Sequence, residues 1–206
     1  LHPQGEAVRI ARIDADTTRL KGTLASQLAQ VHAGEVDVLV GTQMVTKGLD
    51  FDHVSLVGIL DADMLLNRPD FRAYERAFQL MSQVAGRAGR KEKQGKVVIQ
   101  SAQAEHWVLE RVMAHDYIGF YEVEIEERER FFYPPYYKII QLTLKHPKEE
   151  IVNAGAHFLA DHLRTVFKER VLGPEFPIIK RIQNKFLKEI KLKIERDAPD
   201  KKVKAR

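Results

Sequence analysis

The sequence predicts an α/β fold in which a parallel-sheet domain is followed by a smaller α+β domain. Between residues 8 and 115, short apolar runs of strand length alternate with segments whose apolar residues recur every three or four positions, which is typical of a parallel sheet covered by helices. After Tyr133-Pro134-Pro135-Tyr136, one strand pattern precedes one long helical pattern and further strands. That order is typical of a helix packed on an antiparallel sheet.

The composition is that of a globular protein with a substantial core. The chain has 206 residues, 44% of them apolar, and a formal net charge of +4. It has no cysteine, which excludes disulfides and thiolate metal sites, and its eight histidines show no metal-ligand spacing, so we predict no metal site. No apolar run approaches the roughly 20 residues of a membrane helix, and no signal-peptide pattern opens the sequence. We therefore expect a cytoplasmic protein with no membrane partner.

The first elements form a strand-helix-strand unit. Val8 to Ile13 predicts a strand, and Asp14 to Thr18 offers side chains that can cap a helix. Helical spacing then continues as far as Gly34, and Val36 to Val40 predicts the second strand. A right-handed crossover of this kind makes the two strands parallel.

Two more strands and two more helices complete the first domain. Val54 to Leu60 is almost wholly apolar, which predicts a central parallel strand buried on both faces. Asp70 to Met81 predicts an amphipathic helix whose aromatic residues lie in the core rather than on a base-stacking surface. Lys96 to Gln100 predicts the last strand, and His106 to Met113 predicts a helix that covers it.

Two aspartates, Asp61 and Asp63, stand at the carboxyl end of the 54–60 strand. A carboxylate pair in such a place holds magnesium in some enzymes, but this spacing is common in proteins. We expect instead that the two side chains hydrogen-bond to loops beside a nucleotide.

The second half reads as a connector and a small domain. Glu122 to Arg130 mixes acids with arginines three or four apart, as on a mostly exposed helix, and the two prolines then end it in an extended segment. Lys138 to Lys145 predicts a strand and Pro147 to Lys168 a helix. The apolar face of that helix is predicted to carry Ile151, Ala154, Phe158, Leu159, Leu163 and Val166.

The last part of the sequence supplies further strands at 171–174, 178–182 and 186–194. Lysine and arginine residues alternate with apolar residues in these strands. They would either present a basic face to branched DNA or only keep a sheet surface solvated. The cations concerned are Lys180, Arg181, Lys185, Lys188, Lys191 and Lys193.

Two motifs carry residues suited to chemistry. The first, Gly-Thr-Gln-Met-Val-Thr-Lys-Gly-Leu-Asp-Phe at 41–51, leaves the carboxyl end of a predicted strand, where loops form ligand sites in open α/β sheets. The second, Gln-Val-Ala-Gly-Arg-Ala-Gly-Arg at 83–90, ends a helical pattern. At about 100° per helical residue, Gln83, Arg87 and Arg90 lie within an arc of roughly 60°. Two guanidinium groups so placed suit a phosphate chain whose charge changes during reaction.

These segments resemble motifs V and VI of the superfamily 2 helicases. Leu-Asp-Ala-Asp at 60–63, Pro-Asp-Phe-Arg-Ala-Tyr-Glu-Arg at 69–76 and Val-Leu-Gly-Pro at 171–174 are similar to the replication-restart helicases within that superfamily, so the resemblance extends over nearly the whole chain. It implies a RecA-like parallel-sheet helicase lobe at 1–115, a helical connector at 116–136 and a truncated small α+β domain at 137–206.

The resemblance also implies roles for the motif residues. Arg87 and Arg90 would stabilise the γ-phosphate during ATP hydrolysis, and would be the catalytic residues. Gly48, Asp50 and Gln83 would lie on the nucleotide side and couple hydrolysis to the bound strand. Small donors and one lysine would contact the DNA backbone without regard to sequence. These DNA-binding residues are Thr42, Gln43, Thr46 and Lys47.

The activity implied is that of an ATP-dependent 3′-to-5′ DNA helicase in replication restart and primosome assembly at stalled forks, cytoplasmic and associated with the nucleoid. Its partners would be forked or branched DNA, single-stranded DNA, and primosome and replication-restart proteins. ATP and Mg²⁺ would be bound mainly by a first lobe, because this sequence has no Gly-x-x-x-x-Gly-Lys-[Ser/Thr] loop. We therefore expect a piece of a longer protein that is inactive alone. Zinc would bind only in a cysteine-rich insertion that this chain does not contain.

Two other interpretations stay open. One is another superfamily 2 DNA translocase, but the residue sequence at 69–76 argues against it. The other is a non-catalytic module that binds DNA or protein and has kept the lobe without the motor. A phosphate-binding loop in the sequence upstream of Leu1 would favour the motor, and its absence would favour the module.

Overall fold

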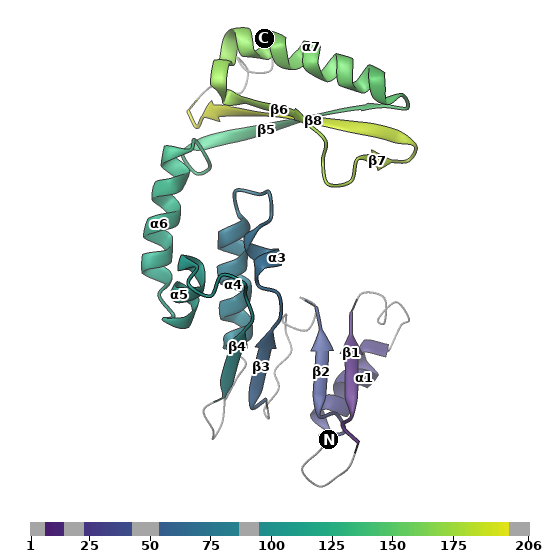
Figure 1. The fold of residues 1–206 in the computed structure, drawn as a ribbon, viewed down its shortest axis with the longest axis vertical. Helices are drawn as coiled ribbons and strands as arrows, with labels where there is room; N and C mark the ends of the chain where they lie inside the picture. The colour runs from purple at the N-terminus through teal and green to yellow at the C-terminus, as the bar shows by residue number, and fades with distance from the viewer. Residues whose placement is uncertain (1–6, 15–22, 43–53, 87–94, 198–206) are drawn as a thin grey trace. The chain divides into compact units, whose positions relative to one another are not determined.

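The structure, a computed structural model, describes residues 7–14, 23–42, 54–86 and 95–197. The chain divides into two compact units, Leu1–Tyr121 and Glu122–Arg206. Figure 1 shows the elements of each. The observed class is the predicted one, an α/β unit with parallel strands followed by a small α+β unit.

The first unit begins with the predicted strand-helix-strand motif. Strand β1 (Ile10–Ile13) and strand β2 (Val38–Gly41) flank helix α1 (Thr23–His32). The two strands pair in parallel, with Ile10 opposite Val38 and Ile13 opposite Gly41. The parallel pairing is thus confirmed, and the first strand is shorter than its apolar pattern suggested.

A second parallel pair follows in the same unit. Strand β3 (Leu56–Ile59) pairs with strand β4 (Lys96–Ile99) over the full length of both. Between them in sequence lie a short helix α3 (Asp63–Leu66) and the long helix α4 (Ala73–Ala85). Helix α5 (Trp107–Met113) comes after β4, and the His106 imidazole caps it by accepting a hydrogen bond from the Val108 backbone N–H.

Helix α4 supplies the centre of the core of this unit. Its buried Phe78 and Met81 pack in one cluster with Val108 of α5 and with Phe120. The Phe78 ring stacks on the Phe120 ring with centroids 4.3 Å apart. The prediction that the aromatic residues of this helix serve the core is confirmed for the described cluster, in which Tyr74 also packs.

The prediction that the 54–60 strand is buried on both faces is wrong. The Leu56 and Leu60 side chains are 58% and 77% exposed, whereas Ile59 packs against the core of the first unit. Among the described residues, β3 has one strand neighbour, and the core lies against only one of its faces. Apolar composition predicted the strand correctly but could not tell how many of its faces are covered.

Helix α6 (Tyr117–Arg130) lies within the segment 116–136 that we expect to be a connector, and the division between the two units falls inside it. Its predicted acid-arginine pairing includes Glu124 and Arg128, whose carboxylate oxygen and guanidinium nitrogen lie 2.9 Å apart. The segment at 134–136 forms a turn rather than the predicted extended chain. It does so because the backbone N–H groups of Tyr136 and Tyr137 both donate to the carbonyl of Tyr133.

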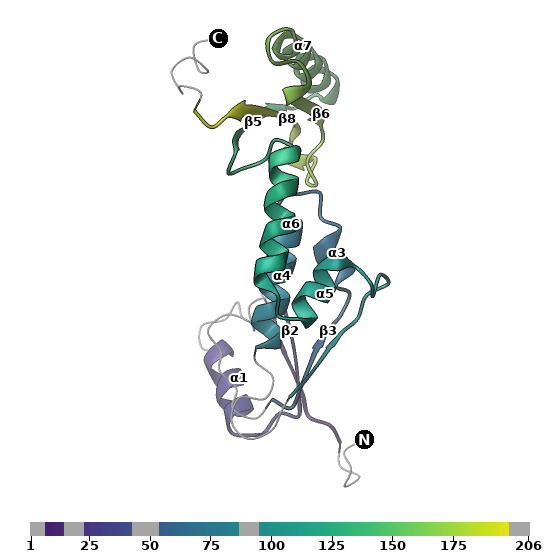
Figure 2. The same cartoon turned by 90° about the vertical axis from the view of Figure 1, so that its left-hand side faces the viewer.

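The second unit is one long helix on an antiparallel sheet, as predicted. Strand β5 (Tyr137–His146) precedes helix α7 (Glu149–Phe167), and a 3₁₀ turn leads into strand β6 (Val171–Glu175). Strand β7 (Arg181–Ile182) and strand β8 (Lys185–Glu195) follow. The sheet order is β5-β8-β6, with β7 paired to β8, and Figure 2 shows α7 along one face of this sheet.

The predicted apolar face of α7 is wrong in part. The helix buries Val152, Ala156 and Ala160 against the sheet. Ile151, Phe158 and Val166 were assigned to the buried face, but they are 50%, 78% and 48% exposed. Apolar residues occupy both sides of this helix, so helical spacing alone does not select the side that faces the sheet.

Candidate functional site

The structure describes two of the predicted site residues, Thr42 and Gln83. The other predicted residues lie outside the described ranges, and the structure describes the elements from which the two motifs start. The residues outside are Gln43, Thr46, Lys47, Gly48, Asp50, Arg87 and Arg90.

Thr42 follows directly on strand β2, at the carboxyl end of the first parallel pair. Its backbone N–H donates to the carbonyl of Ile13, with 3.4 Å between nitrogen and oxygen, so it continues the β1–β2 ladder by one bond. Its side chain is exposed. The loop predicted to contact DNA therefore starts at the strand edge where open α/β sheets bind ligands.

Asp14 is a residue at this edge that sequence reasoning treated only as a helix cap. It lies one position beyond Ile13 in β1, as Thr42 lies one position beyond Gly41 in β2. Its side chain is buried and accepts a hydrogen bond from Arg12 Nε at 2.6 Å. The signal that could have singled it out is its place as the first polar residue after an apolar strand.

Gln83 lies in the last turn of α4 on an exposed side of the helix. The helix ends at Ala85 and has Gly86 as its C-cap. The helical arc predicted for the second motif can therefore be followed only as far as Gly86. Within the helix, the buried side carries Phe78 and Met81, so Gln83 points away from the core.

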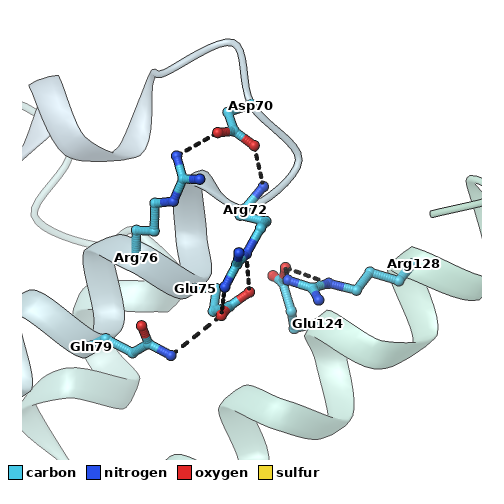
Figure 3. Close-up of polar contacts among 7 residues, drawn as sticks. All are labelled: Asp70, Arg72, Glu75, Arg76, Gln79, Glu124 and Arg128. Atoms are coloured by element: carbon cyan, nitrogen blue, oxygen red, sulfur yellow. Dashed lines mark hydrogen bonds and ion pairs between the residues drawn. The ribbon is translucent and has the colours of Figure 1, made fainter. Parts of the chain in front are cut away.

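The opposite end of α4 is anchored by ion pairs, as Figure 3 shows. The Asp70 carboxylate accepts from the Arg72 backbone N–H at 3.0 Å and from Arg76 Nη1 at 2.5 Å. Arg72 donates from two guanidinium nitrogens to the two carboxylate oxygens of Glu75, at 3.0 and 2.7 Å. The hydrogen bonds that Arg72 donates to Glu75 raise the pKa of Arg72. Two of the arginines that precede the second motif thus have acidic partners within six residues in sequence.

Asp63 ties together the carboxyl ends of β3 and β4. Its carboxylate accepts from the Ala102 backbone N–H at 2.8 Å and from the Ser101 hydroxyl at 2.9 Å. These bonds, with that from Ala102 the stronger influence, lower the pKa of Asp63. The predicted loop hydrogen bond is present, although Asp63 begins helix α3 rather than lying in a loop. Its carboxylate holds the chain that leaves β4.

In the second unit, two of the cations predicted to form a basic face have partners within the unit, one of them an acid. Lys191 Nζ lies 2.9 Å from a carboxylate oxygen of Glu175, and this bond raises the pKa of Lys191. Lys193 is buried and donates to the Phe131 carbonyl at 2.7 Å, and burial lowers its pKa. The body of the sheet is therefore not a uniformly basic surface.

The described parts of the chain hold neither a metal-binding cluster nor a membrane-spanning helix. Across residues 7–14, 23–42, 54–86 and 95–197, no three or more His, Asp or Glu side chains are grouped so that they could hold a metal ion. None of the helices in those ranges is both long and apolar enough to pass through a membrane.

Comparison with known proteins adds sequence relationships to this geometry. Residues 2–92 match the family described as helicase conserved C-terminal domain, and this range includes every predicted site residue. The replication restart protein PriA of Bacillus subtilis is 42% identical over 186 residues, which cover 87% of this chain and 23% of that protein. PriA of Synechocystis is 43% identical over 181 residues, which cover 87% of this chain and 22% of that protein.

A third relative matches at lower identity. PriA of Treponema pallidum is 35% identical over 206 residues, which cover 89% of this chain and 31% of that protein. The chain thus spans less than a third of the length of these curated relatives, and the similarity includes both structural units. The chain belongs to the family of the PriA replication restart proteins, and residues 2–92 are its helicase C-terminal domain.

Proposed function

We propose that the protein containing this chain is an ATP-dependent 3′-to-5′ DNA helicase that acts in replication restart and primosome assembly at stalled forks. The observation that supports it most is the coincidence of two findings. The helicase C-terminal match covers 2–92. Both motifs, at 41–51 and 83–90, lie inside that range, together with the residues proposed to contact phosphate and DNA.

In this proposal the chain contributes the second motor lobe at 1–115, a connector at 116–136 and a small α+β domain at 137–206. Arg87 and Arg90 stabilise the charge that develops on the γ-phosphate. Gln83, Gly48 and Asp50 transmit that event to the DNA loop. The loop residues Thr42, Gln43, Thr46 and Lys47 hold the backbone of the strand along which the motor moves.

Nucleotide use follows from the helicase family, and the finer assignment is also a proposal. ATP and Mg²⁺ are bound mainly by a first lobe, because this sequence carries no phosphate-binding loop. The residues of this chain then stabilise the charge on the γ-phosphate and couple hydrolysis to the DNA loop, but they do not form the loop that holds the phosphates. The chain by itself therefore hydrolyses no ATP. Zinc has no ligands among residues 1–206 in this proposal. The partners are forked and single-stranded DNA and the other proteins of replication restart, in the cytoplasm at the nucleoid.

The decisive experiment replaces one guanidinium of the second motif. In the full-length protein, we expect Arg90→Ala to lower DNA-stimulated ATP hydrolysis by roughly 10³-fold or more, the range measured for arginine fingers. Affinity for a forked DNA without nucleotide should stay within about twofold, since the phosphate-binding charge is not a DNA contact.

Arg76→Ala is the matched control, because it removes an arginine of helix α4, which precedes the second motif, and the Arg76 guanidinium already pairs with Asp70. It should leave ATP hydrolysis near the wild-type rate. Wild-type ATP hydrolysis by Arg90→Ala, or an equal loss of ATP hydrolysis and fork affinity, would refute the assigned role.

A further inference from the structure

We infer that the segment from Phe176 to Lys188, here called the basic hairpin, binds DNA at a junction between duplex and single strand. Its exposed cations, Lys180, Arg181 and Lys185, contact phosphates, and its exposed isoleucines pack against the outer face of the last base pair. This inference rests on the proposed function, because it names the part of the second unit that would recognise the fork. The sequence left open whether the cations of the last strands bind branched DNA or only keep the sheet surface solvated. The inference assigns DNA binding to this one segment.

The charge of the hairpin is the first argument. Within 176–188 there are four basic residues and no acidic residue. Elsewhere in the unit, some cations pair with acids, as Lys191 does with Glu175 and Arg170 with Glu195. The segment 176–188 is therefore a basic stretch without an acidic residue of its own. The basic residues concerned are Lys180, Arg181, Lys185 and Lys188.

The hairpin is well defined by its backbone. Strand β7 pairs with the start of β8, with Arg181 opposite Phe186. The two residues that join them, Gln183 and Asn184, have φ angles of 48° and 59°. Two successive positive φ angles are the mark of a type I′ turn, whose twist matches that of paired strands. The Leu187 N–H donates to the carbonyl of Lys180 at 3.0 Å and extends the pairing.

Aromatic rings hold the cations in place. Lys180 Nζ lies 5.4 Å from the centroid of the Phe176 ring, and the buried Lys188 Nζ lies 3.8 Å from the same centroid and supports the ring from within the sheet. The Arg181 guanidinium lies over the Phe186 ring at 4.9 Å. A cation on a ring face keeps its N–H donors for a phosphate, and its side chain is already ordered before binding.

Exposed apolar side chains form the second argument. Ile178, Ile179 and Ile182 are 87%, 62% and 47% exposed, although isoleucine is among the residues most often buried in proteins. Figure 1 shows the loop with β7 extending beyond the sheet on the side away from α7. Proteins that part or bend DNA commonly place isoleucine, leucine or phenylalanine against a base step, flanked by cations on the backbone.

An acidic protein partner would neutralise the cations of the hairpin, but it would match the placement of its exposed isoleucines less well than DNA does. Ile182 lies directly opposite Lys185, so the two side chains share one face of the hairpin and an exposed apolar group stands beside a cation. A DNA end presents the matching pair, an apolar base-pair face beside a phosphate backbone. We therefore commit to DNA and treat an acidic protein as an outcome of the test.

The test measures binding of full-length protein to fluorescent DNA by anisotropy, without nucleotide, over a range of salt concentrations. The triple variant Lys180→Gln, Arg181→Gln, Lys185→Gln should reduce the slope of log affinity against log salt for a forked DNA by up to about 3, near 1 for each phosphate that the protein no longer neutralises. The double variant Ile178→Ser, Ile179→Ser should keep the salt slope. It should lose roughly 5- to 10-fold of the preference for a fork over a blunt duplex of equal length.

The control variants change exposed residues of the same unit outside the hairpin. Phe158→Ser removes a side chain on α7 that is 78% exposed, and Lys145→Gln removes an exposed cation of β5. Both should bind forks like the wild type. Far-UV circular dichroism of each variant confirms that the unit remains folded.

Each remaining outcome contradicts the inference. Fork binding by the hairpin variants that equals the wild type at every salt concentration overturns it. So does unchanged fork binding combined with loss of retention on a polyglutamate column that retains the wild type, which would assign the hairpin to an acidic protein. Failure of the proposed function would appear separately, as wild-type protein that binds forks but hydrolyses no ATP when DNA is added.

Discussion

Two glycines of the second unit should respond in opposite directions to the same change, and this difference tests the described backbone. Gly173 lies in β6 with a φ of 91°, at an irregularity in its pairing with β8. A Cβ added there would lie 2.7 Å from the Glu189 carbonyl oxygen and 3.1 Å from the Glu175 nitrogen, both backbone atoms that cannot move aside. Arg164 also donates to the Gly173 carbonyl.

The magnitudes follow from these distances. Gly173→Ala should lower the free energy of unfolding of the second unit through two effects. A non-glycine residue in the left-handed region costs about 1–2 kcal/mol, and overpacking costs about 1–3 kcal/mol. Gly155, in α7, has only Leu144 within reach, 3.9 Å from an added Cβ. Gly155→Ala should therefore stabilise the unit by roughly 0.5–1 kcal/mol, because alanine loses less backbone entropy in a helix.

The assay is thermal unfolding of the 206-residue chain followed by two probes. The only tryptophan, Trp107, belongs to the first unit, so its fluorescence reports that unit, whereas far-UV circular dichroism reports both units. At about 4–8 °C per kcal/mol for a domain of this size, Gly173→Ala should lower the Tm of the second unit by at least about 8 °C. Gly155→Ala should raise it by about 2–8 °C, and the tryptophan transition should stay in place. A Tm that moves in the same direction for both variants would refute the reasoning.

Two further predictions concern the first unit. Phe78→Ala removes a buried ring stacked on Phe120 and should lower the free energy of unfolding by about 3–5 kcal/mol in urea titrations followed by tryptophan fluorescence. Met113→Ala, at an exposed position of the same unit, should change it by no more than about 0.5 kcal/mol. Asp63→Asn should lower the Tm at neutral pH and make it fall less as the pH drops. The folded-state pKa of Asp63 is depressed, so its contribution is complete above the unfolded value of about 3.9 and disappears as the pH falls through the folded value. An unchanged acid profile in the asparagine variant would contradict this role.

The structure also explains which parts of the site the sequence could predict. The motif at 41–51 was expected to leave the carboxyl end of a parallel strand, and Thr42 does continue the β1–β2 ladder there. Strand edges of this kind follow from apolar runs and from the handedness of crossovers, both of which are local or general rules. The roles of Arg87, Arg90 and the DNA loop remain predictions, because they depend on residues outside the described ranges.

By itself, the sequence determined the α/β class, the order of the elements, the two motifs and the family. The spacing of apolar residues, the turn residues and the motif sequences are all properties of the chain alone. The tertiary structure decided which faces are covered. It left Leu56 and Phe158 exposed, paired Lys191 with Glu175, and placed the loop with β7 on the side of the sheet away from α7. Burial and ion pairing depend on neighbours that are distant in sequence, and no local pattern names those neighbours.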